Sequence, residues 1–165
     1  TTSTTMMLGL GDALAVAMME RRGFSADQYG VLHPGGLLGR EFIKVDGLMH
    51  KGDELPICGV ATPMSAAILI MTEKRFGCVG VIDGGGALIG IVTDGDLSRH
   101  MDDDLMAKVV GDVMTPGPKT IRPDALAAEA LGFMNDNKIT CLFVADDALP
   151  LGILHVHDIL RAGIA

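Results

Sequence analysis

The sequence predicts an α/β fold of the α+β kind, in which one small β-α-β-β-α unit occurs twice in tandem. The first observation is an internal repeat: GIVTDGDL at 90–97 returns 62 positions later as GILHVHDI at 152–159. The second is that CVGVID at 78–83 aligns with CLFVAD at 141–146. A long repeat means two copies of one supersecondary unit. We therefore expect two small mixed sheets with helices packed on them.

Composition narrows the class of protein. The chain has 165 residues, of which 48% are apolar, and a net charge of −8. This length suits one compact module with an appendage. Nucleic-acid and membrane-surface binders need basic patches, so we expect neither kind of partner. The sequence has no signal-peptide pattern and no apolar run of spanning length, which predicts a cytoplasmic protein.

The segment 1–45 precedes the repeats. Threonines at its start and Gly23 as a stop signal predict a helix over 1–23. Apolar residues occur on most sides of this helix, which predicts that it is buried. We therefore expect the chain to be cut from a longer protein. A capping box at 25–28 predicts one short helical turn, and the sequence HPGGLLG at 33–39 predicts a loop.

The first repeat, assigned to 46–104, predicts the order strand, helix, strand, strand, helix. Ala67, Ile68 and Met71 lie on one face of its first helix, and a DGGG sequence marks a hairpin turn. The elements are expected at 64–74 (helix), at 78–82 and 88–93 (strands) and from Asp94 or Asp96 onward (closing helix).

The second repeat, assigned to 105–165, follows the same order. Pro123 stands before its first helix, and two aspartates mark the turn between its strands. The elements are expected at 124–135 (helix), at 141–145 and 151–155 (strands) and at 158–162 (closing helix).

These residues resemble the tandem cystathionine-β-synthase (CBS) domain pair, also called a Bateman module. The most specific part is the closing signature of Gly, two apolar residues, Thr or Ser, two further residues and Asp. The first copy fits fully, with Thr93 and Asp96, whereas His155 replaces Thr in the second copy. The resemblance implies a regulatory module that binds a nucleotide in a cleft, and a homodimer formed through stacked helical faces.

The remaining residues resemble the end of a sugar isomerase (SIS) domain, in TSTT at 2–5, GDALAVA at 11–17 and HPGGLLGR at 33–40. An SIS tail before a CBS pair is similar to D-arabinose 5-phosphate isomerases. These enzymes interconvert ribulose 5-phosphate and arabinose 5-phosphate for synthesis of the lipopolysaccharide sugar Kdo. The resemblance makes 1–45 an SIS remnant and linker. It implies a higher homo-oligomer for the intact enzyme and a fragment that is not catalytic by itself.

His33 stands where the SIS family places an active-site histidine. In the intact enzyme such a residue moves protons between the two sugar carbons of an aldose–ketose exchange. The alternative role is that of a structural loop histidine.

Asp96 and Asp158 are the first candidate ligand-binding residues. At this position in nucleotide-binding CBS pairs, the carboxylate accepts hydrogen bonds from adjacent ribose hydroxyls. The alternative is a plain helix N-terminus, where a carboxylate contributes about 0.3–1 kcal/mol through the helix dipole. Thr93 offers a hydroxyl to a phosphate or ribose oxygen. Because His155 replaces it in the second repeat, we expect the two clefts to differ.

Two arginines and one further threonine complete the candidate set. Arg99 and Arg161 follow the aspartates by three residues, within reach of a ligand phosphate, or they are solvated surface residues. Thr115 lies near the start of the second repeat, where family members contact a base. His155 and His157 lack a third ligand in the sequence, so we predict no metal site. The three cysteines are interpreted as buried, reduced thiols.

The resemblance implies no required cofactor. It implies a regulatory nucleotide, for which AMP, ADP and ATP are the general candidates. A CMP-linked sugar is a further candidate, because such a molecule is the end product of the family's pathway. The alternative function is a purely structural oligomerisation module whose clefts bind no ligand.

Overall fold

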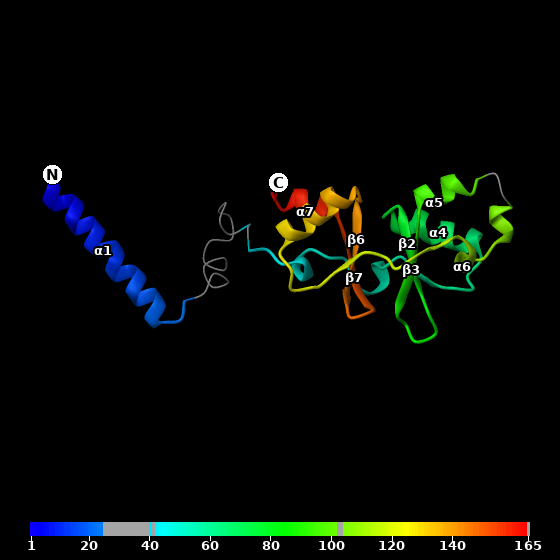
Figure 1. Cartoon of the computed structure of the whole chain (residues 1–165), viewed down its shortest axis with the longest axis horizontal. Coiled ribbons are helices and arrows are strands. Elements are labelled where there is room, and N and C mark those ends of the chain that lie inside the picture. Colours follow the sequence, from blue (N-terminus) through cyan, green and yellow to red (C-terminus); the bar gives the residue numbers. More distant parts are fainter. Residues whose placement is uncertain (25–39, 41, 102–103, 165) are drawn as a thin grey trace. The chain divides into compact units, whose positions relative to one another are not determined.

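The structure, a computed structural model, describes residues 1–24, 40, 42–101 and 104–164. The chain divides into two units, at 1–42 and 43–165, which are described separately. In the first unit, helix α1 (Thr2–Arg21) confirms the expected helix (Figure 1). None of its residues is buried. No helix in the described residues has both the length and the hydropathy to cross a membrane.

Two sequence predictions fall outside the described residues. They are the helical turn at 25–28 and the loop at 33–39, which contains His33.

The second unit contains both repeats and confirms the tandem arrangement (Figure 1). The first half consists of the short 3-10 helices Val45–Gly47 and Gly52–Glu54, β1 (Ile57–Gly59), α4 (Met64–Lys74), β2 (Cys78–Ile82), β3 (Leu88–Thr93), α5 (Asp94–Arg99) and the 3-10 helix Leu105–Ala107. The second half consists of α6 (Val110–Val113), β4 (Thr115–Pro116), β5 (Thr120–Ile121), α7 (Ala127–Asn137), β6 (Cys141–Asp146), β7 (Leu149–His155) and α8 (Val156–Arg161).

The two long helices of this unit have the same design. Helix α4 buries Met64, Ala67 and Met71, a spacing that places all three on one face toward its sheet. Helix α7 buries apolar residues at the same spacing. Each helix ends at a basic residue in the left-handed conformation, Arg75 with φ of 63° and Lys138 with φ of 54°.

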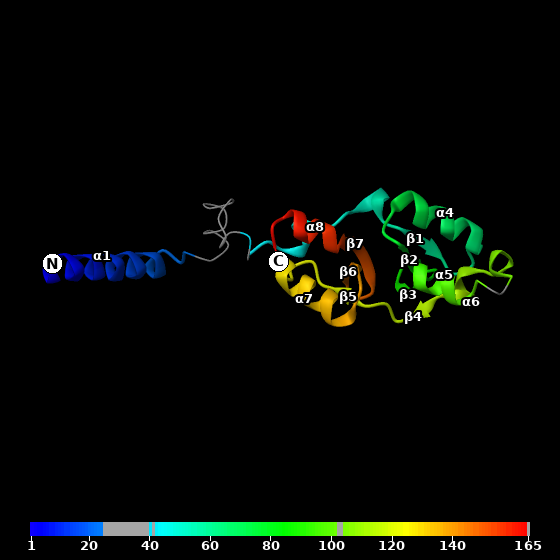
Figure 2. The same ribbon diagram turned by 90° about the horizontal axis from the view of Figure 1, so that it is seen from above.

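Each sheet is completed by residues from the start of the other repeat. The first sheet has the order β1-β2-β3-β4, and the second has the order β5-β6-β7. Strand β4 belongs to the start of the second repeat, yet its Thr115 pairs with Ile91 of β3 (Figure 2). In the equivalent place, His50 bridges Ile153 of β7. The repeats therefore exchange their first segments and form one body.

The hydrophobic cores follow this exchange. Val45 lies in the core of the second repeat, where its N–H donates to the Ala125 carbonyl at 2.9 Å. Val110 and Val113 lie in the core of the first repeat. This reciprocal packing fixes the strand ends that carry Thr93 and His155.

A third cluster joins the two sheets. It contains Phe76, Cys78, Leu88, Phe143 and Ile153. Phe143 and Gly80 occupy equivalent positions in the two repeats. A Cβ on Gly80 would lie 2.7 Å from the Phe143 ring, so the glycine provides the space that the ring fills.

Candidate functional site

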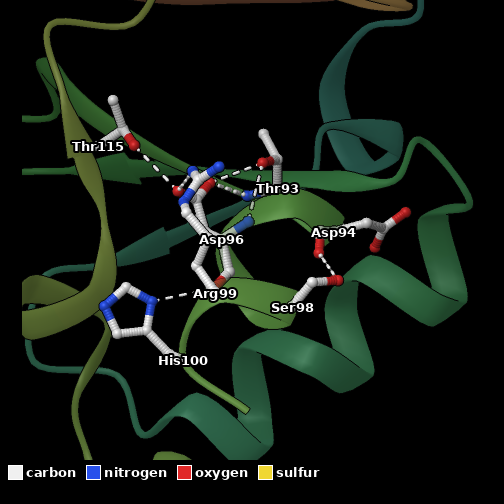
Figure 3. A network of polar contacts seen from close by, with 7 residues as sticks. All are labelled: Thr93, Asp94, Asp96, Ser98, Arg99, His100 and Thr115. Atoms are coloured by element: carbon white, nitrogen blue, oxygen red, sulfur yellow. Dashed lines mark hydrogen bonds and ion pairs between the residues drawn. The ribbon is translucent and has the colours of Figure 1, made fainter.

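The first strand-to-helix junction is organised by a capping box (Figure 3). Thr93 ends β3 and is the N-cap of α5. Its backbone N–H and its hydroxyl both donate to Oδ2 of Asp96, at 2.8 Å and 2.6 Å. The Asp96 N–H in turn approaches the Thr93 hydroxyl at 3.4 Å. The sequence pattern Thr-x-x-Asp therefore fixes the position of the carboxylate.

The other carboxylate oxygen of Asp96 contacts two more side chains. Arg99 donates to Oδ1 through Nη2 at 2.5 Å, and the Thr115 hydroxyl donates at 3.0 Å (Figure 3). Thr115 reaches this point because β4 pairs with β3. Each oxygen of Asp96 thus has two partners, which satisfies a carboxylate that is only 2% exposed.

These contacts set the ionisation of Asp96. Burial opposes the charged form, but the hydrogen bonds from Thr93, Thr115 and Arg99 outweigh it and lower the pKa of the carboxyl below its ordinary value. Asp96 is therefore a fixed negative charge at neutral pH.

A cavity of about 450 Å³ opens beside this junction. Its lining includes the four candidates Thr93, Asp96, Arg99 and Thr115, the basic Lys119 and Lys138, the acidic Asp94, the polar or sulfur-containing Cys78, Cys141 and Thr140, the apolar Ile91, Ile139, Phe143 and Pro118, and three glycines. Both repeats contribute to its walls. A concave site with an apolar wall and a few polar groups is typical of small-molecule binding.

The sequence did not identify the two lysines as site residues. Lys138 reaches the cavity because α7 ends there in the left-handed conformation. Lys119 precedes β5, and its Nζ donates to the Asn137 amide oxygen. Neither lysine belongs to the repeated signature, so no local pattern marks them.

The second junction has the same backbone plan with different side chains. His155 is the N-cap of α8, and its Nδ1 accepts a hydrogen bond from the His157 N–H at 3.1 Å. The His155 N–H donates to Oδ2 of Asp158 at 3.3 Å. Arg161 approaches Oδ1 of Asp158 at 3.6 Å.

His50 stands in this junction where Thr115 stands in the first. Its Nε2 lies 3.1 Å from Oδ2 of Asp158, and its Nδ1 lies 3.2 Å from Glu54. Its ring meets the edge of Phe76, with the centroids 5.1 Å apart. The alignment of LM at 48–49 with VM at 113–114 extends to this pair, so the repeat itself could have revealed the replacement.

The imidazole rings change the electrostatics of the second junction. Burial and the neighbouring His157 lower the pKa of His155 below its ordinary value, and the Asp158 carboxylate only partly offsets this. The structure thus places His155, Asp158 and Arg161 together, but in a cluster separate from the cavity residues at α5. No group of three His, Cys, Asp or Glu side chains within the described residues is arranged to hold a metal ion.

This fold and this pair of junctions define a class of protein. The CBS domain family model matches residues 45–103 and 110–165. The chain therefore belongs to the CBS domain family, in agreement with the prediction from the repeat. Solved structures agree: CBSX2 of Arabidopsis thaliana is 28% identical with a TM-score of 0.64, over 73% of this chain and 93% of that one. The structure of CBSX2 in complex with AMP is 30% identical with a TM-score of 0.65, over 73% and 95%.

Similarity to curated proteins indicates one group of enzymes among the proteins that contain CBS domains. The chain is 48% identical to arabinose 5-phosphate isomerase KdsD of Pseudomonas aeruginosa, over 99% of this chain and 52% of that protein. It is 45% identical to the Escherichia coli K12 enzyme of the same name, over 99% and 51%. The similarity to this isomerase family, predicted from sequence, is confirmed. The chain spans about half the length of these curated relatives.

Proposed function

We propose that this chain is the regulatory part of an arabinose 5-phosphate isomerase and that it senses a nucleotide in the cavity beside α5. The observation that carries the proposal is the cavity itself, which gathers the repeated Thr and Asp, a second threonine and three basic side chains. The similarity to the isomerases supports the attached activity. The AMP complex of CBSX2 supports an adenine nucleotide as the ligand.

The ribose of the nucleotide would bind to Asp96 by replacing hydrogen-bond donors that the carboxylate already has. Both carboxylate oxygens already have two donors each, so ribose hydroxyls must replace some of them. Arg99 is the partner most easily displaced, because its side chain is 65% exposed. The released guanidinium then pairs with the ligand phosphate, a strong charge-assisted contact.

The remaining cavity residues suit the rest of a nucleotide. Arg99, Lys119 and Lys138 outnumber the two carboxylates of the lining, Asp94 and Asp96, which favours an anionic ligand in a chain with a net charge of −8. The apolar wall of Ile91 and Ile139 suits the flat face of a base. The competing ligand is a CMP-linked sugar, which would share the ribose and phosphate contacts and differ in its base.

Calorimetry on matched variants tests this proposal. Wild type, Asp96→Asn and Asp158→Asn are titrated with AMP, ATP, CMP and CMP-Kdo. A hydrogen bond to a charged group contributes about 1.5–3 kcal/mol, so Asp96→Asn should weaken binding about tenfold or more. Asp158→Asn is the control and should retain the wild-type affinity within about twofold. If no ligand binds the wild-type chain, the structural oligomerisation role replaces nucleotide sensing.

The regulatory link is tested in the full-length enzyme. We propose that 1–45 is the end of an SIS domain, on the resemblance given above. The isolated chain is then expected to give no turnover of arabinose 5-phosphate in a coupled assay. In the full-length enzyme the bound nucleotide should change the rate, and Asp96→Asn should move that response to about tenfold or more higher nucleotide concentration. A rate that is insensitive to the nucleotide would contradict regulation through this cavity.

We also propose a homodimer formed through the CBS pair. Helices α7 and α8 leave Phe133 and Leu160 exposed at 37% and 46%, and apolar side chains of this kind suit a contact between copies. Light scattering of the purified chain tests this, and a monomer at high concentration would contradict it.

A further inference from the structure

Two cysteines from different repeats meet beside the cavity. Cys78 is the first residue of β2, Cys141 is the first residue of β6, and their sulfur atoms are 3.5 Å apart. The Cys141 thiol donates to the Phe76 carbonyl at 2.9 Å. Since this uses the only proton of Cys141, Cys78 must be the donor between the two thiols. Cys78 is buried, as the sequence predicted, whereas Cys141 is only half-buried.

The two thiols differ in reactivity. The hydrogen bond from Cys78 lowers the pKa of Cys141 below its ordinary value. The same bond, together with burial, raises the pKa of Cys78. Both cysteines line the cavity, but Cys141 is partly exposed, whereas Cys78 is 1% exposed. An attacking thiolate that is accessible, beside a second thiol that can resolve the product, is the arrangement of redox-responsive pairs.

The pair is also connected to both junctions. In the sheets, Cys78 pairs with Thr93 and Cys141 pairs with His155. These partners are the N-caps of α5 and α8. A disulfide bond is about 2.05 Å long, so the sulfurs must approach by about 1.5 Å from their separation of 3.5 Å. That movement acts on the residues that hold Asp96.

We propose that Cys78 and Cys141 form a redox site, at which a peroxide links the two repeats covalently and weakens ligand binding in the cavity. With hydrogen peroxide, the Cys141 thiolate attacks one peroxide oxygen and becomes a sulfenic acid, and hydroxide leaves. The Cys78 thiol then attacks that sulfur, which forms the S–S bond and releases water. The two thiols lose two electrons in all, and one peroxide becomes two waters. The effect on binding rests on the proposed nucleotide site, whereas the disulfide does not.

Peptide mapping tests the disulfide directly. Trypsin places the three cysteines in three separate peptides, 52–74, 76–99 and 139–161, because no Lys-X or Arg-X bond lies inside them. After treatment with hydrogen peroxide, the wild-type protein should give 76–99 linked to 139–161. The control variant Cys58→Ser removes a buried thiol in the core of the first repeat and should give the same linked pair. Cys78→Ser and Cys141→Ser should not.

Calorimetry with AMP tests the coupling. The mapped, oxidised wild-type protein should bind AMP about fivefold or more weakly than the reduced protein, with recovery after dithiothreitol. Saturating AMP should slow disulfide formation, because it covers Cys141. An oxidised protein without the linked peptides overturns the redox site, and a linked protein with unchanged affinity overturns the coupling. If reduced protein binds no AMP, the nucleotide proposal fails, while the mapping still decides the disulfide.

Discussion

The two strand-to-helix junctions share one backbone plan and differ in their side chains. At the first, two threonine hydroxyls and one arginine surround a carboxylate whose side chain is 3% exposed. At the second, two histidines take the threonine positions around a carboxylate whose side chain is 17% exposed. Hydroxyls are small and leave open space beside Asp96, whereas the larger rings of His50 and His155 lie next to Phe76, with centroids 5.1 Å and 6.4 Å from that ring.

This difference shows that duplication preserves geometry more readily than chemistry. The Asp of the signature lies at the helix start in both repeats, and the Gly lies inside a strand where a Cβ would meet Met114 in the first repeat and Met49 in the second. The capping position accepts either a hydroxyl or an imidazole nitrogen as acceptor. The other threonine position lies on the segment that the repeats exchange. It holds Thr115 in the first junction and His50 in the second. The first junction therefore keeps the features of a ligand site, and the second becomes a histidine cluster.

The substitution with the largest expected effect removes a contact between the two repeats. Phe143→Ala should lower the free energy of unfolding by about 3–5 kcal/mol, because a fully buried ring leaves a cavity opposite Gly80. Urea unfolding with a constant m-value measures this. Phe133→Ala, at a ring that is 37% exposed on α7, is the control and should cost about 1 kcal/mol or less. Equal costs would show that the central cluster does not hold the two sheets together.

Removal of the two carboxylates compares the junctions directly. Asp96→Ala should cost about 2–3 kcal/mol, because it leaves the half-buried N–H and hydroxyl of Thr93 without their acceptor. Asp158→Ala should cost about 1 kcal/mol, as for an ordinary capping residue. Because the pKa of Asp96 is lowered in the folded state, its contribution is present above about pH 4 and is lost as the pH falls further. The stability gap between wild type and Asp96→Ala should therefore narrow in acid. A similar cost for both substitutions at neutral pH would contradict the assigned difference in burial.

Substitution of the two signature glycines, Gly90 and Gly152, compares the repeats in the same way, with a smaller expected effect on stability. The three atoms that a Cβ on Gly90 would approach most closely all belong to the flexible Met114 side chain, which can move aside. A Cβ on Gly152 would lie 2.5 Å from the Met49 sulfur and 2.8 Å from the His50 carbonyl oxygen, which the bridge to Ile153 holds in place. Gly152→Ala should therefore cost about 1–3 kcal/mol, and Gly90→Ala less than about 1 kcal/mol. Thermal unfolding of the two variants decides the order, and the reverse order would contradict the bridge as a rigid element.

The sequence predicted the elements that have a strong local pattern. The helix at 64–74 and the strands at 78–82 and 88–93 have the predicted bounds, because apolar periodicity and the glycine turn define them. The later elements differ by a few residues, as α7 begins at Ala127 rather than at 124. Such shifts at helix ends are small compared with the agreement in order and type.

The exchange of segments between the repeats could not be predicted in the same way. Strand β4 has two residues, and the His50 bridge has one, so neither is long enough to show a period. The four-partner environment of Asp96 depends on Thr115, which is 19 positions away and is brought close only by that exchange. Local patterns place the candidates on the chain, and long-range pairing decides which of them share a cavity.

The smallest expected effect concerns pH and the second junction. Nδ1 of His155 accepts the His157 N–H, which only an unprotonated Nδ1 can do. Burial and His157 lower the pKa of His155 in the folded state. As the pH falls, His155 therefore takes up a proton in the unfolded chain at a higher pH than in the folded chain. The stability that the neutral His155 contributes is fully present above about pH 6.5 and is lost as the pH falls below that value.

In His155→Thr, a hydroxyl caps α8 at every pH, and the fall in Tm between about pH 7.5 and 5 should be shallower than in wild type. His100→Gln removes a histidine at the end of α5 and should keep the wild-type slope. If His155→Thr keeps that slope as well, the histidine cap does not make the second junction sensitive to pH, and the chemical contrast between the two repeats is smaller than their hydrogen bonds indicate.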